Sequence, residues 1–206
     1  GMIAVGGQDC VFYAIVLNPN GEPIPELAPE AAITEPHEVK RDTKERIYHK
    51  YIDTVEDENG TPTSIEFKNT DGFNFAFDLV DELGRREPEK LAMLHIDINK
   101  VERRFTFADI SRESSRCANY FKSLGIKKGD RVMLVLKRHY QFWLAMIGLN
   151  KLGAIAIPAT NQLQVHDFEY RFQAAGVNTI ICTSDDNCPS QVEEAAKTCP
   201  ELINKL

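Results

Sequence analysis

The sequence predicts an α/β protein: a partial doubly wound parallel sheet with flanking helices, preceded by an irregular N-terminal arm and a β-hairpin. Residues 132–136 form an uninterrupted apolar run with the length of a strand that is buried on both faces. Apolar residues between 142 and 150 then recur at spacings of three and four, the period of a helix. Gly153 suits a helix end because it tolerates positive φ, and residues 154–158 read as a second buried strand. The two strands of such a unit are parallel.

The alternation of strand and helix continues toward the end of the chain. Residues 165–175 have a helical pattern that Gly176 ends, residues 179–183 read as a third parallel strand, and residues 191–198 as a further helix. This order favours a doubly wound sheet with helices on its faces.

A hairpin and a helix are predicted before this region. Residues 91–98 and 101–105 read as two strands joined by a turn at Asn99 and Lys100. Thr106 is a suitable N-cap for a helix that extends to about residue 124. Its predicted inner side carries Ile110, Ala118 and Phe121.

The first part of the chain has a weaker pattern, and we divide the sequence into an extended or weakly structured arm, residues 1–43, and a larger domain, residues 44–206. Residues 9–17 are compatible with a strand, whereas the five prolines between positions 19 and 36 disfavour regular structure. Apolar residues between 44 and 55 recur at helical spacing and predict an amphipathic helix, although the same residues also alternate as a strand would.

Composition excludes some classes of function. The 24 basic and 31 acidic residues give a net charge of −7, which argues against a nucleic-acid partner held through its phosphates. The sequence predicts no membrane anchor and no signal peptide, because its apolar run near the start is short and follows no basic residues. Five cysteines without a C-x-x-C pair predict reduced thiols and a cytoplasmic location.

Neither G-x-G-x-x-G nor G-x-x-x-x-G-K-[ST] occurs, which disfavours a Rossmann dehydrogenase. Residues 137–140 follow the central strand at its carboxyl end, where ligands of open α/β sheets bind. They either offer cations to an anion or form a solvated corner on which Tyr140 packs, and we favour the corner. His139 has no acidic or nucleophilic partner near it in sequence. Asp185 and Asp186 are interpreted as a turn or helix cap rather than a cation site, and Trp143 as a core residue.

Three segments resemble motifs of the AMP-forming, adenylate-forming synthetases. Residues 105–110, FTFADI, resemble L-T-Y-x-E-L, residues 124–132, LGIKKGDRV, resemble L-G-I-x-x-G-D-x-V, and residues 149–160, LNKLGAIAIPAT, resemble L-K-A-G-x-x-Y-V-P. Residues 73–75 and 158–162 are similar to acyl-CoA synthetases of the medium-chain type. The resemblance covers roughly residues 44–206.

The resemblance implies a ligase of fatty acid metabolism that joins a carboxylic acid to ATP, releases pyrophosphate and passes the acyl group to coenzyme A. ATP, Mg and coenzyme A are the cofactors expected of such a parent protein. The family's phosphate loop, T-S-G-T-T-G-x-P-K, is absent from this sequence. The chain is therefore expected to be an N-terminal fragment, truncated before that loop, that supplies scaffold and part of the pocket wall but is not catalytic alone.

Gln162 is the residue that the resemblance suggests as a contact to substrate or coenzyme A, and a loop without a ligand is the other interpretation. We assign no catalytic residue and no metal ligand to this stretch. The partners implied are the remainder of the synthetase chain, a small carboxylic acid and coenzyme A, while the oligomeric state stays open. The alternative function is a stand-alone, non-catalytic α/β module for binding or subunit association.

Overall fold

The computed structural model describes residues 2–6, 12–16, 47–68 and 70–206. Contacts divide the chain into two units, Gly1–Arg46 and Ile47–Leu206. In the first unit β1 (Met2–Gly6) pairs antiparallel with β2 (Phe12–Val16), and β2 falls inside the strand predicted over residues 9–17. Most of the arm expected over residues 1–43 lies outside the described residues.

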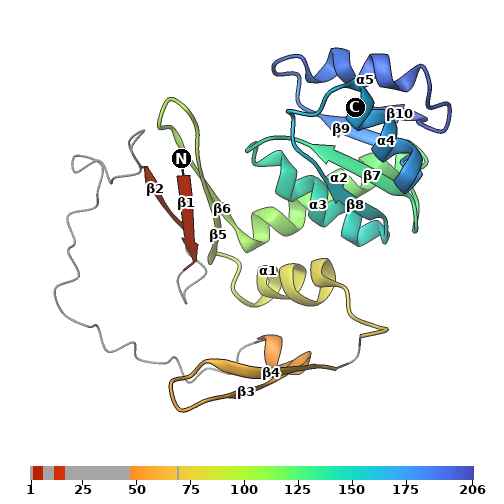
Figure 1. Cartoon of the computed structure of the whole chain (residues 1–206). Helices are drawn as coiled ribbons and strands as arrows, with labels where there is room; N and C mark the ends of the chain where they lie inside the picture. The colour runs from red at the N-terminus through yellow and green to blue at the C-terminus, as the bar shows by residue number, and fades with distance from the viewer. Residues whose placement is uncertain (1, 7–11, 17–46, 69) are drawn as a thin grey trace. The chain divides into compact units, whose positions relative to one another are not determined.

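A four-stranded parallel sheet forms the centre of the second unit (Figure 1). Its strands are β7 (Arg131–Val135), β8 (Ile155–Pro158), β9 (Thr179–Cys182) and β10 (Asn204–Lys205), in the order β10-β9-β7-β8. The chain moves from β7 outward to β8 and then crosses back to β9 on the other side of β7. This reversal confirms the predicted doubly wound topology.

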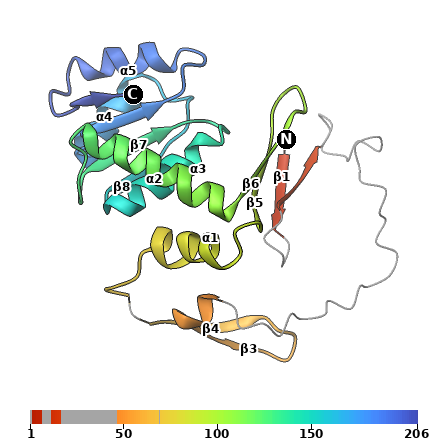
Figure 2. The same cartoon turned by 180° about the vertical axis from the view of Figure 1, so that it is seen from behind.

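Four helices cover the two faces of the sheet (Figure 2). Val132 and Leu134 of β7 point toward one face, which is covered by α2 (Phe107–Ser123) and α3 (Gln141–Leu152). Met133 and Val135 point toward the other face, which is covered by α4 (Val165–Ala175) and α5 (Cys188–Ala196). Because successive side chains of a strand alternate between faces, the apolar run of β7 builds both halves of the core.

The predicted hairpin and the helix that follows it are confirmed. β5 (Leu91–Ile96) pairs antiparallel with β6 (Glu102–Thr106). Thr106 then caps α2: its hydroxyl accepts a hydrogen bond from the Asp109 amide, while the Asp109 carboxylate accepts from the Thr106 amide. The predicted inner residues Ile110, Ala118 and Phe121 are all buried.

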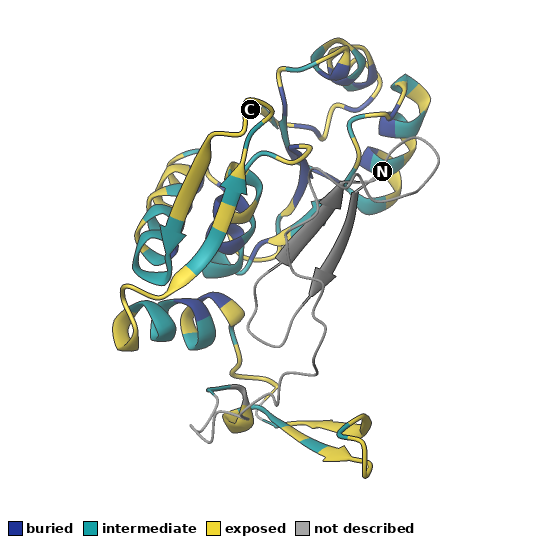
Figure 3. Cartoon of the chain, turned by 90° about the vertical axis from the view of Figure 1, so that its left-hand side faces the viewer, coloured by how far each residue is buried: buried dark blue, intermediate teal, exposed yellow. Residues whose placement is uncertain are grey.

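The helix predicted over residues 44–55 is wrong. After one short 3-10 turn, Ile47–Lys50, the chain forms β3 (Ile52–Glu56), which pairs antiparallel with β4 (Pro62–Phe67) in a largely exposed hairpin (Figure 3). The turn decides this outcome. The Asp57 carboxylate accepts hydrogen bonds from two turn amides, and Gly60 adopts φ +78°. The residues predicted to alternate therefore do not form the strand: Ile47–Lys50 make the 3-10 turn, and β3 begins only at Ile52.

Two expectations about burial are also wrong. β8 is an edge strand rather than a buried one, and Ile155 is half exposed because no described strand lies beyond it. Trp143 is 53% exposed instead of being part of the core, and its ring packs edge-on against Phe142. Apolar residues lie on almost every side of the first turns of α3. Their spacing in the sequence therefore does not identify which side of the helix packs against the sheet.

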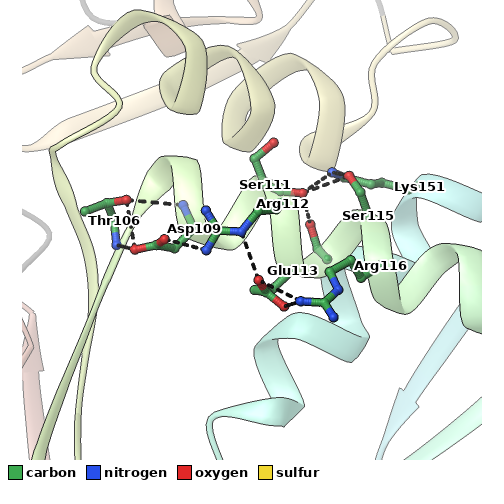
Figure 4. Close-up of polar contacts among 9 residues, drawn as sticks. Thr106, Asp109, Ser111, Arg112, Glu113, Ser115, Arg116 and Lys151 are labelled. Carbon is green, nitrogen blue, oxygen red and sulfur yellow. Dashed lines mark hydrogen bonds and ion pairs between the residues drawn. The ribbon is translucent and has the colours of Figure 1, made fainter.

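A buried lysine ties α3 to the preceding helices. A π-helical segment, η2 (Phe75–Asp81), continues into α1 (Glu82–Arg86). The Lys151 ammonium donates to the Asp81 carboxylate at 2.7 Å, the Ser115 hydroxyl at 2.8 Å and the Ser111 carbonyl at 3.0 Å. Figure 4 shows Lys151 reaching across to the two serines of α2. All three ammonium protons thus have acceptors.

No helix in the described part of the chain has both the length and the apolar character that crossing a membrane requires.

Candidate functional site

The carboxyl ends of β7, β8 and β9 meet at one edge of the parallel sheet. Residues 136–140 follow β7, residues 159–164 follow β8 and residues 183–187 follow β9. The direction of winding reverses between β7 and β9, and ligands of open α/β sheets bind outside the carboxyl ends of the strands at such a reversal. Polar side chains from all three loops come together there.

Lys137 forms the first link between these loops. Its ammonium lies 2.8 Å from a carboxylate oxygen of Asp186 and 3.4 Å from one of Asp185. Lys137 adopts φ +48° and Asp186 φ +55°, so both partners of the shorter ion pair have left-handed backbones. The two aspartates predicted to form a turn therefore also bind the basic residue after β7, 48 and 49 positions away.

His139 has the acidic partner that the sequence did not indicate. Its Nε2 atom lies 3.1 Å from the Thr183 hydroxyl and 3.1 Å from an Asp185 carboxylate oxygen. Both contacts converge on the same ring nitrogen, whereas a hydrolytic triad uses one ring nitrogen for the carboxylate and the other for the nucleophile. The arrangement is therefore a polar tie between the loops after β7 and β9, and not a nucleophile with its base.

The loop after β8 supplies Asn161 and Gln162. The Asn161 side-chain amide donates to the Asp186 carboxylate at 3.1 Å. Gln162 is exposed, its backbone amide donates to the Thr160 hydroxyl at 3.3 Å and its carbonyl accepts from Gln164. Its side-chain amide makes no hydrogen bond to any residue that the structure describes, so both its donor and its acceptor face solvent.

Neighbouring groups at this edge shift the pKa values of Asp185 and Lys137. The Thr183 hydroxyl, then His139 and Lys137, lower the pKa of the Asp185 carboxyl by hydrogen bonds to its charged form. Asp186, as the main partner, raises the pKa of the Lys137 ammonium. Asp185 and Lys137 are therefore both ionised near neutral pH, and the Lys137 ammonium lies against the carboxylates of Asp185 and Asp186.

A shallow hollow of about 250 Å³ lies elsewhere, beside β8 and α4. Its lining is mostly apolar and contains Arg171, which is held by the Asp167 carbonyl and carboxylate of its own helix. Its polar side chains, Tyr170 and Arg171, come from one helix only, whereas the carboxyl edge brings polar side chains from three loops together, so the carboxyl edge is the better candidate site.

The structure brings only some of the residues predicted at the carboxyl edge into contact with one another. Tyr140 packs against Phe105 and His95, as expected of a corner residue, while Arg103 lies over its ring. Sequence reasoning missed Thr183 and Asn161, although each follows a strand of the predicted sheet. Polar residues just after consecutive parallel strands were the signal that would have found them.

The model of the AMP-binding enzyme family matches residues 80–205. Rat acyl-coenzyme A synthetase ACSM5, mitochondrial, is 36% identical over 141 residues, which are 65% of this chain and 24% of the relative. Human acyl-coenzyme A synthetase ACSM3, mitochondrial, is 35% identical over 140 residues, again 65% of this chain and 24% of the relative. The chain thus spans about a quarter of the length of these curated relatives.

Solved structures support the same fold. The inhibitor-bound N-terminal domain of FACL13 from Mycobacterium tuberculosis superposes with a TM-score of 0.57 at 23% identity, covering 65% of this chain and 33% of that domain. A fatty acyl CoA synthetase from Mycobacterium tuberculosis gives a TM-score of 0.58 at 22% identity, with 65% and 26% covered. The family match extends over more than half of the chain and includes the whole parallel sheet. The chain therefore belongs to the family of AMP-binding enzymes.

Proposed function

We propose that this chain is the N-terminal part of an AMP-forming acyl-CoA synthetase, in which it supplies framework and one wall of the ligand site. The complete protein would join a carboxylic acid to ATP and pass the acyl group to coenzyme A, with Mg as the metal cofactor. Similarity to acyl-CoA synthetases supports this proposal. The remainder of the synthetase would supply the phosphate loop, because the described chain holds none.

The observation that carries the proposal is the family match over residues 80–205, and Gln162 offers a contact residue because its exposed side-chain amide lies at the carboxyl edge of the sheet. A primary amide that offers a donor and an acceptor fits a carboxylate, a peptide-like linkage or a hydroxyl. Coenzyme A contains amide linkages in its arm, and the acid contains the carboxylate. We therefore propose Gln162 as a contact to coenzyme A or to the acid.

Kinetics of Gln162→Ala in the complete synthetase test this role. Loss of one neutral hydrogen bond is expected to raise the KM of the contacted ligand about two- to tenfold. If the ligand is coenzyme A, acid-dependent ATP–pyrophosphate exchange stays unchanged while the KM for coenzyme A rises. If the ligand is the acid, the exchange reaction itself shows the higher KM.

Gln173→Ala is the matched control, because Gln173 is exposed on α4 and no strand end or loop of the carboxyl edge includes it. Equal kinetics for Gln162→Ala and the unsubstituted synthetase would remove Gln162 from the proposed site. The isolated 206-residue chain is expected to release no pyrophosphate from ATP with any fatty or aromatic acid. Pyrophosphate release proportional to the amount of chain would contradict the proposal that the chain needs the rest of the synthetase for catalysis.

The cytoplasmic location expected from the cysteines stays a prediction. The four cysteines that the structure describes, Cys117, Cys182, Cys188 and Cys199, are free. The curated relatives carry mitochondrial names. Cell fractionation with an antibody against the chain decides between the two compartments.

A further inference from the structure

The three loops at the carboxyl edge are held together by one set of polar contacts, which we call the loop latch. Asp186 receives the Lys137 ammonium from one neighbouring loop and the Asn161 amide from the other. Asp185 contacts both Lys137 and His139. The loop latch thus consists of Lys137 and His139 after β7, Asn161 after β8, and Asp185 and Asp186 after β9.

Both residues of the shorter ion pair in the loop latch have left-handed backbones, and the strain falls on Lys137. Among the described residues, three that are not glycine have positive φ: Lys100, Lys137 and Asp186. Lys100 occupies the tip of the β5–β6 hairpin, where the turn requires such a residue. Lys137 and Asp186 lie instead at the reversal point of the sheet. Aspartate tolerates the left-handed region, but lysine gains no local hydrogen bond there, and such strain concentrates at ligand-binding sites.

The loop latch is accessible and weakly held. The side chains of Lys137, His139 and Asp185 are 32%, 43% and 44% exposed, and that of Asp186 is 61% exposed. Ion pairs at this exposure contribute little, because water screens them and the side chains lose freedom. A solute anion can therefore compete with the carboxylates for Lys137 and His139 without opening the core.

We propose that the loop latch is an oxyanion-binding site kept closed by the chain's own carboxylates. Asp185 and Asp186 occupy Lys137 and His139 until a phosphate or carboxylate group of a ligand replaces them, which frees the loop after β9 to move. The proposal rests on the proposed function only in taking the carboxyl edge as the ligand-facing side. Its test needs no synthetase activity, so the two can fail separately.

The test is an NMR titration of the ¹⁵N-labelled 206-residue chain at constant ionic strength and neutral pH. Inorganic pyrophosphate and acetate are the two probes, with sodium chloride as the reference. Saturable shifts are expected for the amides of residues 137, 139, 185 and 186. Shifts with pyrophosphate alone assign a phosphate ligand, shifts with acetate alone a carboxylate ligand, and shifts with both a general oxyanion site; each supports the proposal.

Variants separate competition from simple loop support. Asp186→Asn keeps a residue that tolerates positive φ but removes the competing charge, so it is expected to tighten binding of the probe about two- to fivefold. Lys137→Met is expected to weaken binding at least fivefold. Lys100→Met is the matched control, since it removes a lysine with the same backbone conformation at the hairpin tip, and it is expected to leave the affinity unchanged.

Three results would overturn the proposal. The first is a titration in which neither probe shifts the amides of the loop latch beyond the sodium chloride reference. The second is an Asp186→Asn chain that is folded but binds the probe no more tightly, which would leave the aspartate a purely structural partner. The third is an equal loss of affinity in Lys100→Met and Lys137→Met, as expected of a diffuse surface charge.

Discussion

Lys151 offers the sharpest test of how the helices are joined. Its side chain is 5% exposed, and its ammonium is shared by Asp81 of η2 and by Ser111 and Ser115 of α2. Lys151→Met keeps most of the aliphatic volume but leaves the Asp81 carboxylate without its cation. Breaking a buried ion pair in this way costs about 3–5 kcal/mol. Because Asp81 is 28% exposed, water recovers part of that loss, and we expect about 2–3 kcal/mol.

Urea unfolding of the 206-residue chain measures this loss as a lower free energy of unfolding. In thermal unfolding the same change lowers Tm by roughly 4–12 °C for a chain of this size. Adding Asp81→Asn to Lys151→Met is expected to restore part of the stability, because the unpaired charge is then gone. Lys197→Met is the control, since Lys197 is 67% exposed in its pair with Glu194 and should change stability by less than about 0.5 kcal/mol. Equal effects of Lys151→Met and Lys197→Met would refute the reasoning.

Two further predictions concern α2 and its contacts. A Cβ at Gly148 would lie 3.0 Å from both the Cys117 Cβ and the Ser114 carbonyl oxygen. Even after the gain in helix propensity, Gly148→Ala should therefore lower the free energy of unfolding in urea by about 1 kcal/mol. Gly72→Ala is the control and should leave that free energy unchanged, because a Cβ at Gly72 would meet no atom within 4 Å. The Thr106 amide, followed by Arg112, lowers the pKa of Asp109. A lowered folded-state pKa stabilises the chain above the ordinary carboxyl pKa near 4, and this contribution is lost as pH falls through the lowered value. The urea midpoint should therefore drop more on acidification in the unsubstituted chain than in Asp109→Asn, and parallel curves would contradict the assignment.

Elements in which the hydrophobic period, the capping residues and the packing all favour the same structure were predictable from the sequence. α4 carries a helical period and ends at Gly176, which adopts φ +58° as expected of a helix C-cap. α2 follows Thr106, the N-cap that the sequence suggested, and the structure adds a capping box with Asp109. Local chemistry and packing favour the same structure in these elements, so reading the sequence sufficed.

Other features depend on contacts that a sequence period does not reveal. Residues 44–55 have apolar spacings that are compatible with both a helix and a strand, and pairing with β4 across the Asp57 turn makes residues 52–56 a strand. Trp143 lies on a helix that is apolar on several sides, so its exposure depends on how α3 is oriented against the sheet. β10 has two residues and leaves no pattern to find.

The sequence predicted where the candidate site lies, but it did not predict which residues contact one another there. Residues 137–140 were expected at the carboxyl edge because they follow a parallel strand, whereas Gln162 was suggested by the family resemblance alone. The partners of Lys137 and His139 lie more than 40 positions away along the chain, after β9. Strand order brings them together, and that order follows from the crossing of the chain over β7.

The proposal that this chain is the N-terminal part of a longer synthetase is tested most directly by sequencing the transcript past the codon for Leu206. We expect an open reading frame that continues into a Ser/Thr/Gly-rich phosphate loop of the T-S-G-T-T-G-x-P-K type. A stop codon directly after Leu206, in a transcript that is translated, would contradict the proposed function and favour a stand-alone binding or subunit-association module.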